Sequence, residues 1–200
     1  MNSLFPSEKI IFDVPNAVIE YHPNFFTAEK SSFLFEKLRQ EIPWQQDHIT
    51  VYGKTHLQPR LTALLGNEGK PYSYSNIVMQ PHHWNPLLMF IKNEVEDVCN
   101  ENFTTVLLNL YRDGSDSNGW HADNEKELGR NPVIASVSFG AERMFHLQHN
   151  TIVDAKLKIN LENGSLLIMK GETQHFWKHQ ISKTTKPIGP RINLTYRIIK

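Results

Sequence analysis

The second half of the chain consists of short segments that are apolar throughout or alternate apolar and polar residues, each closed by a turn signal. From residue 103 onward the turn signals are Gly, Pro, Asn and Asp, and no helical repeat of apolar residues separates the segments. This pattern is typical of an antiparallel sandwich or barrel, and it leaves little room for alternating βαβ units. We predict strands at Thr104–Tyr111, Val133–Phe139, Arg143–His149, Lys156–Leu161, Ser165–Lys170, Gln174–His179 and Arg191–Ile199.

The first half of the chain carries the helical signals. Thr27 suits the N-cap of a helix that ends at about Ile42, because Pro43 follows. A second helix is predicted at Asn85–Asn100, with one apolar face made of Leu88, Ile91, Val95 and Val98. A short strand is expected at Ala17–Tyr21, and residues 48–80 are expected to form hairpins and loops.

The charge of the chain is balanced overall but unevenly distributed. The 200 residues contain 21 lysines and arginines and 21 aspartates and glutamates, which excludes a uniformly basic coat for nucleic acid. Residues 170–200, however, hold seven lysines and arginines and only one acid, Glu172. A polyanionic partner would therefore need a local patch. A chain of this length can bury a core without a metal, so we expect any bound metal to serve chemistry.

Cys99 is the only cysteine, so the chain forms no internal disulfide and suits a reducing compartment. The sequence contains no run of 18 apolar residues and no N-terminal signal-peptide pattern. We expect a monomer that is not secreted, does not enter a membrane and works in the cytoplasm, or in the nucleus of a eukaryote.

His121 and Asp123 form a candidate metal-binding pair. If the chain leaves a strand near Trp120, these two side chains point to the same side, because alternate residues of an extended chain share a face. A third ligand from a distant strand would complete the triad of two histidines and one carboxylate found in non-haem Fe(II) oxygenases. The alternative is a solvated His–Asp pair in a loop.

The last predicted strand has two chemically different faces. Arg191, Asn193, Thr195 and Arg197 share one face, and Ile192, Leu194, Tyr196 and Ile198 share the other. An arginine that faces inward needs an anion. The Cα atoms of Arg191 and Arg197 would be about 20 Å apart at ~3.3 Å per residue, so two leaning side chains leave room for a five-carbon dicarboxylate. The alternative is an exposed edge strand with solvated arginines.

Six motifs, in this order, resemble the AlkB-like Fe(II)- and 2-oxoglutarate-dependent dioxygenases, in particular the nucleic-acid demethylases. They are Asn-Leu-Tyr-Arg-Asp-Gly at 109–114, Trp-His-Ala-Asp-Asn-Glu at 120–125, Ile-Ala-Ser-Val-Ser-Phe-Gly at 134–140, Gly-Ser-Leu-Leu-Ile-Met at 164–169, His179, and Pro-Arg-Ile-Asn-Leu-Thr-Tyr-Arg at 190–197. The resemblance runs from about residue 48 to the C-terminus. It implies a mainly β protein, a double-stranded β-helix (jelly roll). Residues 1–200 would form one domain, with an N-terminal elaboration of hairpins and two supporting helices over about 1–102 and a catalytic core over about 103–200.

The resemblance also implies roles for single residues. His121, Asp123 and His179 would bind Fe(II), with His175 as a neighbour of that site. Arg191 would pair with the distal carboxylate of the cosubstrate 2-oxoglutarate. The rest of the cosubstrate pocket would consist of Asn109, Tyr111, Asn193, Thr195 and Arg197.

Substrate recognition is expected in the hairpins before the second helix. The segments that contain Tyr52, Gly53, Lys54 and Arg60 resemble hairpins that approach DNA, and Tyr72, Ser73 and Tyr74 resemble a lid over a flipped base. An aromatic side chain can fill the gap that a flipped base leaves, and Lys54 and Arg60 can contact phosphates. Core packing of the three tyrosines within the hairpins is the alternative.

Further substrate contacts are expected from Asn124 and Glu125, and Lys183 and Lys186 are expected to border the same face. Two positions depart from the family pattern. Asn124 stands where relatives often have a second acid, and no proline follows His179 in Gln180-Ile181-Ser182.

Together these features imply an oxidoreductase of DNA repair. It would remove N-alkyl groups from bases of the 1-methyladenine and 3-methylcytosine type in DNA or RNA, with release of formaldehyde, succinate and CO2. One alternative is an oxygenase that acts on a protein side chain or a small molecule, which would not need Tyr52, Lys54 and Arg60 exposed. The other is a noncatalytic jelly-roll binding module, which would not need a complete triad and two inward arginines.

Overall fold

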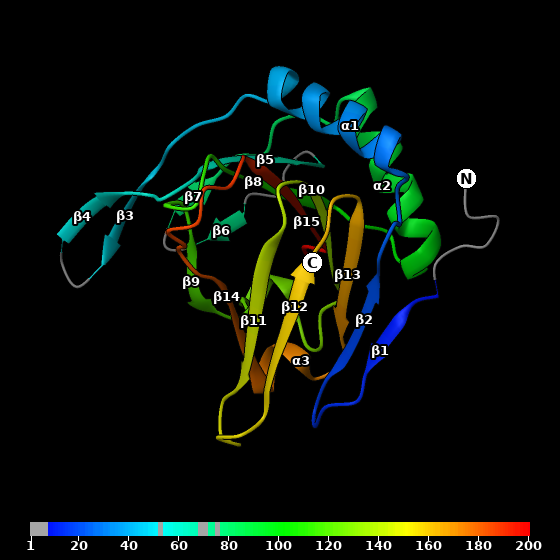
Figure 1. Ribbon diagram of the computed structural model, residues 1–200, viewed down its shortest axis with the longest axis vertical. Helices are drawn as coiled ribbons and strands as arrows, with labels where there is room; N and C mark the ends of the chain where they lie inside the picture. The colour runs from blue at the N-terminus through cyan, green and yellow to red at the C-terminus, as the bar shows by residue number, and fades with distance from the viewer. Residues whose placement is uncertain (1–7, 52–53, 68–71, 75–76) are drawn as a thin grey trace.

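Two antiparallel β-sheets face each other in the computed structural model, which describes residues 8–51, 54–67, 72–74 and 77–200 (Figure 1). Within these residues the larger sheet has the strand order β1-β2-β13-β10-β15-β8-β5 and the smaller sheet the order β12-β11-β14-β9. The larger sheet consists of β1 (Ile10–Phe12), β2 (Val18–His22), β5 (Leu61–Gly66), β8 (Thr105–Tyr111), β10 (Ile134–Gly140), β13 (Ser165–Lys170) and β15 (Arg191–Arg197). The smaller sheet consists of β9 (Asn118–His121), β11 (Arg143–His149), β12 (Lys156–Leu161) and β14 (Trp177–Ile181). The predicted mainly β jelly roll is confirmed.

The two sheets differ in how many of their faces are buried. In the smaller sheet burial alternates: Phe145 and Leu147 of β11 pack between the sheets, whereas Met144 is exposed. In the larger sheet every residue of β8 and β15 is buried, because helices cover the face that points away from the smaller sheet. This difference explains why some strand segments alternate in sequence and others are apolar throughout.

Both predicted helices are present. In α1 (Ala28–Glu41) the Thr27 side chain accepts a hydrogen bond from the Lys30 amide, and in α2 (Pro86–Cys99) Asn85 accepts one from the Leu88 amide. A 3-10 turn, Lys126–Leu128, follows β9 along the chain. None of the described helices has both the length and the apolar character needed to cross a membrane.

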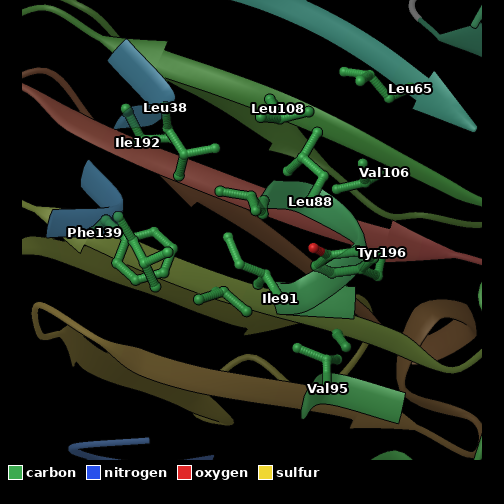
Figure 2. Close-up of a cluster of buried hydrophobic side chains, with 14 of the residues drawn as sticks. Leu38, Leu65, Leu88, Ile91, Val95, Val106, Leu108, Phe139, Ile192 and Tyr196 are labelled. Carbon is green, nitrogen blue, oxygen red and sulfur yellow. The ribbon is translucent and has the colours of Figure 1, made fainter. Parts of the chain in front are cut away.

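The packing of α2 agrees with the predicted apolar face except at one position. Figure 2 shows Leu88, Ile91 and Val95 lying against side chains of the larger sheet. Val98, predicted on the same face, is 43% exposed. At 3.6 residues per turn Val98 lies about 80° around the helix from Leu88, at the edge of the buried stripe.

The described part of residues 48–80 contains hairpins, as expected, and one strand that the prediction missed. The hairpins are β3 (His48–Val51) with β4 (Lys54–Leu57) and β6 (Tyr72–Tyr74) with β7 (Ile77–Met79), and β3–β4 projects away from the sheets (Figure 1). The missed strand, β5, pairs with β8 at the edge of the larger sheet. Its apolar residues are as buried as those of a core strand.

The strand predicted at Gln174–His179 was wrong in its first half. Thr173–Phe176 form a helical turn, α3, and the strand β14 begins only at Trp177. The Thr173 hydroxyl donates to the Lys170 carbonyl and accepts from the Val18 amide at 3.0 Å. The contact with Val18, which is distant in sequence, helps to stabilise the turn, so the local apolar pattern could not reveal it.

Gly164 lies where the turn before β13 meets the start of α1. It has φ +78°, its amide donates to the Ser138 carbonyl, and its carbonyl accepts from the Phe26 amide. A Cβ here would overlap Ser31 Oγ and approach the Phe26 carbonyl oxygen to 2.6 Å. We therefore expect Gly164→Ala to lower the free energy of unfolding by about 2–3 kcal/mol, measured by urea denaturation.

Gly119 provides the matched control, because nothing lies within 4 Å of a Cβ at that position. Equal stability of the Gly164→Ala and Gly119→Ala variants would contradict the steric explanation.

Candidate active site

The structure brings His121, Asp123 and His179 together at the smaller sheet. His121 and His179 are register partners on β9 and β14, and their Nε2 atoms are 3.2 Å apart. Asp123 follows β9, with Oδ2 3.9 Å from His179 Nε2. One nitrogen or oxygen atom from each residue lies within 4.8 Å of the others. The three side chains could therefore hold a single metal ion. The spacing of His121 and Asp123 predicted the pair, and the family resemblance added His179.

Hydrogen bonds orient two of these side chains. The Gly119 carbonyl can only accept a hydrogen bond, so His121 Nδ1, which lies 2.8 Å from it, carries the proton and donates it. The lone pair of this imidazole is therefore on Nε2. Arg197 Nη2 donates to Asp123 Oδ1 at 2.7 Å, and the Asp123 amide donates to Gln174 Oε1 at 2.9 Å. One carboxylate oxygen of Asp123 is thus bound by Arg197, while Oδ2 faces the histidines.

The electrostatics of the three residues suit a divalent cation. Burial alone would raise the pKa of Asp123, but Arg197 and the two histidines outweigh it and lower that pKa to about 2. Burial, reinforced by His121, lowers the pKa of His179 to about 3, and burial also lowers the pKa of His121. At neutral pH the site therefore presents two neutral imidazoles and one carboxylate, the protonation states that metal ligands require.

All six residues predicted for the cosubstrate line the same cavity between the sheets as the three candidate ligands. They are Asn109, Tyr111, Arg191, Asn193, Thr195 and Arg197. The arginine strand β15 lies in the middle of the larger sheet, between β10 and β8, so the alternative of an exposed edge strand is wrong. Its polar face lines the cavity, and its apolar face packs in the core under the helices.

Arg191 is the residue of this cavity that most clearly calls for an anion. Its side chain is 1% exposed, and Nη2 donates to Ser138 Oγ at 2.9 Å. Nε and Nη1 are buried and have no hydrogen-bond partner among the described residues, and no described carboxylate forms an ion pair with Arg191. Burial lowers the pKa of Arg191 to about 10, against the opposing effect of Tyr111. A carboxylate ligand would satisfy these donors.

Three predicted residues have environments other than those expected. Arg60 is 3% exposed and does not lie on an open rim, because its Nε donates to Asn109 Oδ1 at 2.7 Å and its Nη1 to the Ser117 carbonyl. Arg197 forms an ion pair with Asp123. Its main contact is thus with the candidate metal ligand rather than with a dicarboxylate. His175 is exposed on α3 and bonded to Asn131. It is not a neighbour of the site, because α3 turns it away.

The remaining predicted residues are placed only in part. Asn124 is exposed and Glu125 half-buried, both directly after Asp123. Tyr52 and Gly53 lie outside the described residues. Lys54 is in β4, and Tyr72, Ser73 and Tyr74 form β6, but their side chains are not among those described. Lys183 and Lys186 line a cleft beside the smaller sheet, together with Arg143 and His146.

Sequence reasoning missed residues that support the site from neighbouring elements. Ser136 and Ser138 of β10 bond to Asn193 and Arg191. The two serines are two residues apart, so they share one face of β10, beside the polar face of β15. That spacing was the signal in the sequence that could have identified them. Gln174 gave no such signal, because the turn α3 that carries it was predicted to be a strand.

Gln174 positions Asp123 through the main chain. Gln174→Leu would leave the buried amide of Asp123 without its acceptor, so we expect the affinity for Mn²⁺, measured by calorimetry, to fall at least about 10-fold. Gln148→Leu, on β11 and away from Asp123, is the control. Unchanged Mn²⁺ affinity in a folded Gln174→Leu protein would show that this bond does not position the ligand.

Comparisons with known proteins agree with this site. Residues 19–197 match the 2OG-Fe(II) oxygenase superfamily. Alpha-ketoglutarate-dependent dioxygenase alkB homolog 3 of Homo sapiens is 41% identical over 188 residues, which are 89% of this chain and 65% of that protein. DNA oxidative demethylase ALKBH2 of Homo sapiens is 35% identical over 184 residues, which are 87% of this chain and 70% of that protein. The chain thus spans slightly less than two thirds of the length of its alkB homolog 3 relatives.

Solved structures share the fold at low identity. The structure of OsALKBH1 has a TM-score of 0.68 and 16% identity, over 96% of this chain and 100% of that one. A prolyl hydroxylase from Trichoplax adhaerens, in complex with a peptide fragment of hypoxia inducible factor, has a TM-score of 0.61 and 13% identity, over 90% and 83% of the two chains. From the family match and the identity to ALKBH2, the chain belongs to the 2OG-Fe(II) oxygenase superfamily and, within it, to the AlkB-like oxygenases.

Proposed function

We propose that the chain is an oxidative demethylase of nucleic acid. It would remove N-alkyl groups of the 1-methyladenine and 3-methylcytosine type from DNA or RNA and release formaldehyde, succinate and CO2. The observation that carries the proposal is the 35% identity to a protein named as a DNA oxidative demethylase, combined with a complete His-Asp-His cluster beside the orphaned Arg191.

The residues present fit iron and 2-oxoglutarate. His121, Asp123 and His179 would hold the metal. They supply two neutral imidazoles and one carboxylate, which is the donor set of an Fe(II) site that keeps open coordination positions. The two unpartnered guanidinium nitrogens of Arg191 would bind the distal carboxylate of 2-oxoglutarate, and Tyr111 and Asn109 line the same cavity.

The chemistry divides between the bound groups and the chain. When bound, iron and 2-oxoglutarate couple O2 to the hydroxylation of a C–H bond, and a hydroxylated N-methyl group leaves as formaldehyde. Arg197 keeps Asp123 ionised and fixes one of its oxygens. Phe145, Leu161 and Ile181 line the cavity and keep water from its apolar side.

Substrate contacts are proposed at the mouth of the cavity. Asn124 and Glu125 directly follow Asp123, so they would contact the base that carries the methyl group. The hairpins β3–β4 and β6–β7, with Tyr52, Lys54, Tyr72 and Tyr74, would contact the strand and the vacancy left by the flipped base. Arg60 is excluded from this role, because it is buried against Asn109.

The proposal is tested by measuring formaldehyde and succinate release from methylated oligonucleotides, both DNA and RNA, single-stranded and duplex. We expect both products from at least one substrate and none from the His179→Ala variant. Succinate release without formaldehyde from any methylated oligonucleotide would contradict the nucleic-acid substrate, and the alternative oxygenase on a protein side chain or small molecule would replace it.

We further propose that the protein is a monomer. It would work in the cytoplasm, or in the nucleus if the organism is a eukaryote. Cys99, the last residue of α2, is half-buried against the core and suits a reducing compartment. Elution as a dimer in size-exclusion chromatography would contradict the monomer.

A further inference from the structure

The outer face of the smaller sheet is polar except at the exposed Met144, and no other element of the described chain covers it. In register across β12, β11 and β14 lie two rows, Lys156–Gln148–Lys178 and Lys158–His146–Gln180. The inward neighbours of these residues, such as Leu147 and Ile159, are buried between the sheets. Helices cover only the larger sheet. We call the two rows together with Trp120 the outer platform.

The platform carries positive charge that the chain does not neutralise. Among the described residues, Lys156, Lys158 and Lys178 form no ion pair, whereas Lys9, Lys37, Lys92 and Lys170 each have a carboxylate within 4 Å. Of the acids nearest to these strands in sequence, Asp154 and Glu162 lie beyond the two ends of β12, whereas the Glu142 carboxylate accepts a hydrogen bond from Asn160 of β12 without pairing with a lysine of the platform. The charge of the platform is therefore complementary to a polyanion.

An exposed aromatic side chain lies at the end of the platform nearest the site. Trp120 of β9 is 42% exposed, and Lys178 Nζ lies 5.7 Å from the centre of its ring. Its neighbour His121 points into the cavity. The platform crosses four strands, from β12 to β9, and so spans about 14 Å at ~4.8 Å between neighbouring strands.

A cleft of ≈ 320 Å³ adjoins the platform at His146. Its lining also includes Lys183, Lys186 and one acid, Glu142.

We infer that the outer platform binds a single strand of nucleic acid through its phosphates, with a base stacked on Trp120. This inference rests on the proposed function, because the strand on the platform would be the one whose base enters the cavity. Proteins that bind single strands without sequence preference combine positive charge along the backbone with aromatic side chains on which bases stack. The platform offers three lysines and one such side chain. An acidic polypeptide shares the charge but has no bases to stack.

The test measures binding of an unmethylated 20-nucleotide strand by fluorescence anisotropy over a salt series. Lys156→Gln/Lys158→Gln is compared with Lys37→Gln/Arg39→Gln, which removes the same charge from α1 on the opposite side of the molecule. If each platform lysine meets one phosphate, the slope of log K against log salt falls by about 1.4, and affinity at 0.1 M salt falls about 25-fold. The α1 variant should bind within twofold of the parent.

Trp120 is tested on the same strand in metal-free protein, since His121 is adjacent. Trp120→Phe should retain most of the affinity, and Trp120→Ala should lose about fivefold or more. Equal affinity of Trp120→Ala and the parent would overturn the stacking contact.

The arms separate the possible failures. If the platform double variant matches the parent in affinity and salt slope, the inference fails, whatever the enzyme demethylates. If polyglutamate competes as strongly as the oligonucleotide and equally needs Lys156 and Lys158, the occupant is an acidic polypeptide and the assignment is overturned. If the parent releases no formaldehyde from methylated oligonucleotides, the proposed function fails.

Supporting results are a raised KM for a methylated 20-mer in the double variant and unchanged turnover of a methylated mononucleotide.

Discussion

Replacing Arg191 by alanine should raise the 2-oxoglutarate concentration needed for half-maximal turnover by at least about 30-fold, because the loss of one partner of a buried charge pair costs roughly 2–5 kcal/mol. Arg191 lines the cavity and is buried, and two of its guanidinium nitrogens have no hydrogen-bond partner among the described residues. The distal carboxylate would therefore form stronger new hydrogen bonds with Arg191 than with any neighbouring residue. Affinity for Mn²⁺ in the absence of 2-oxoglutarate should be nearly unchanged, since Arg191 contacts none of the candidate ligands.

Arg191→Met is the companion variant, because it keeps most of the volume and removes only the charge. It should show the same loss for 2-oxoglutarate with less loss of stability. If both variants keep the parent's 2-oxoglutarate requirement, another residue anchors the diacid.

Replacing Arg197 by methionine should destabilise the metal-free protein by about 3–5 kcal/mol, because it leaves the carboxylate of Asp123 buried without its closest cation. Urea denaturation in the presence of a chelator measures this loss. Added Mn²⁺ should recover part of it, because a bound cation supplies the missing charge.

The effect of Arg197→Met should depend on pH in a defined direction. In the parent, the pKa of Asp123 is held near 2, below its ordinary value of 3.8, so the ion pair contributes stability above pH 4 and loses it as pH falls toward 2. In the variant, burial acts without Arg197 to oppose it and raises that pKa. The difference in unfolding free energy between parent and variant should therefore be largest at neutral pH and shrink as pH falls through the raised pKa of the variant toward 2.

Arg39→Met is the control. The Arg39–Glu36 pair on α1 has an N–O distance of 3.7 Å, and its two side chains are 47% and 57% exposed, whereas both side chains of the Arg197–Asp123 pair are buried. An exposed pair contributes at most about 1 kcal/mol. Similar losses in the two variants would show that burial does not set the strength of the Arg197–Asp123 pair.

Local sequence patterns were sufficient to predict most of the elements of this protein. The caps Thr27 and Asn85 marked the helix starts, and residues of alternating polarity marked β11 and β15, because these signals act within one turn or one strand. The motif residues His121, Asp123 and His179 could be named in advance, and so could the polar face that carries Arg191.

Contacts between distant segments decided the rest. Burial of Arg60 against Asn109, the pairing of Arg197 with Asp123, and the turn that brings Gln174 to the Asp123 amide each join residues at least 49 positions apart. No periodicity within a segment encodes such a partner. The charge of a side chain is fixed by the sequence, but whether that charge meets water, a phosphate or a buried carboxylate depends on which strands the fold places beside it. For that reason the sequence by itself determined most of the strands and helices and the chemistry of the candidate ligands, and only the tertiary structure decided that Arg60 and Arg197 are bonded within the protein while, among the described residues, two nitrogens of Arg191 are not.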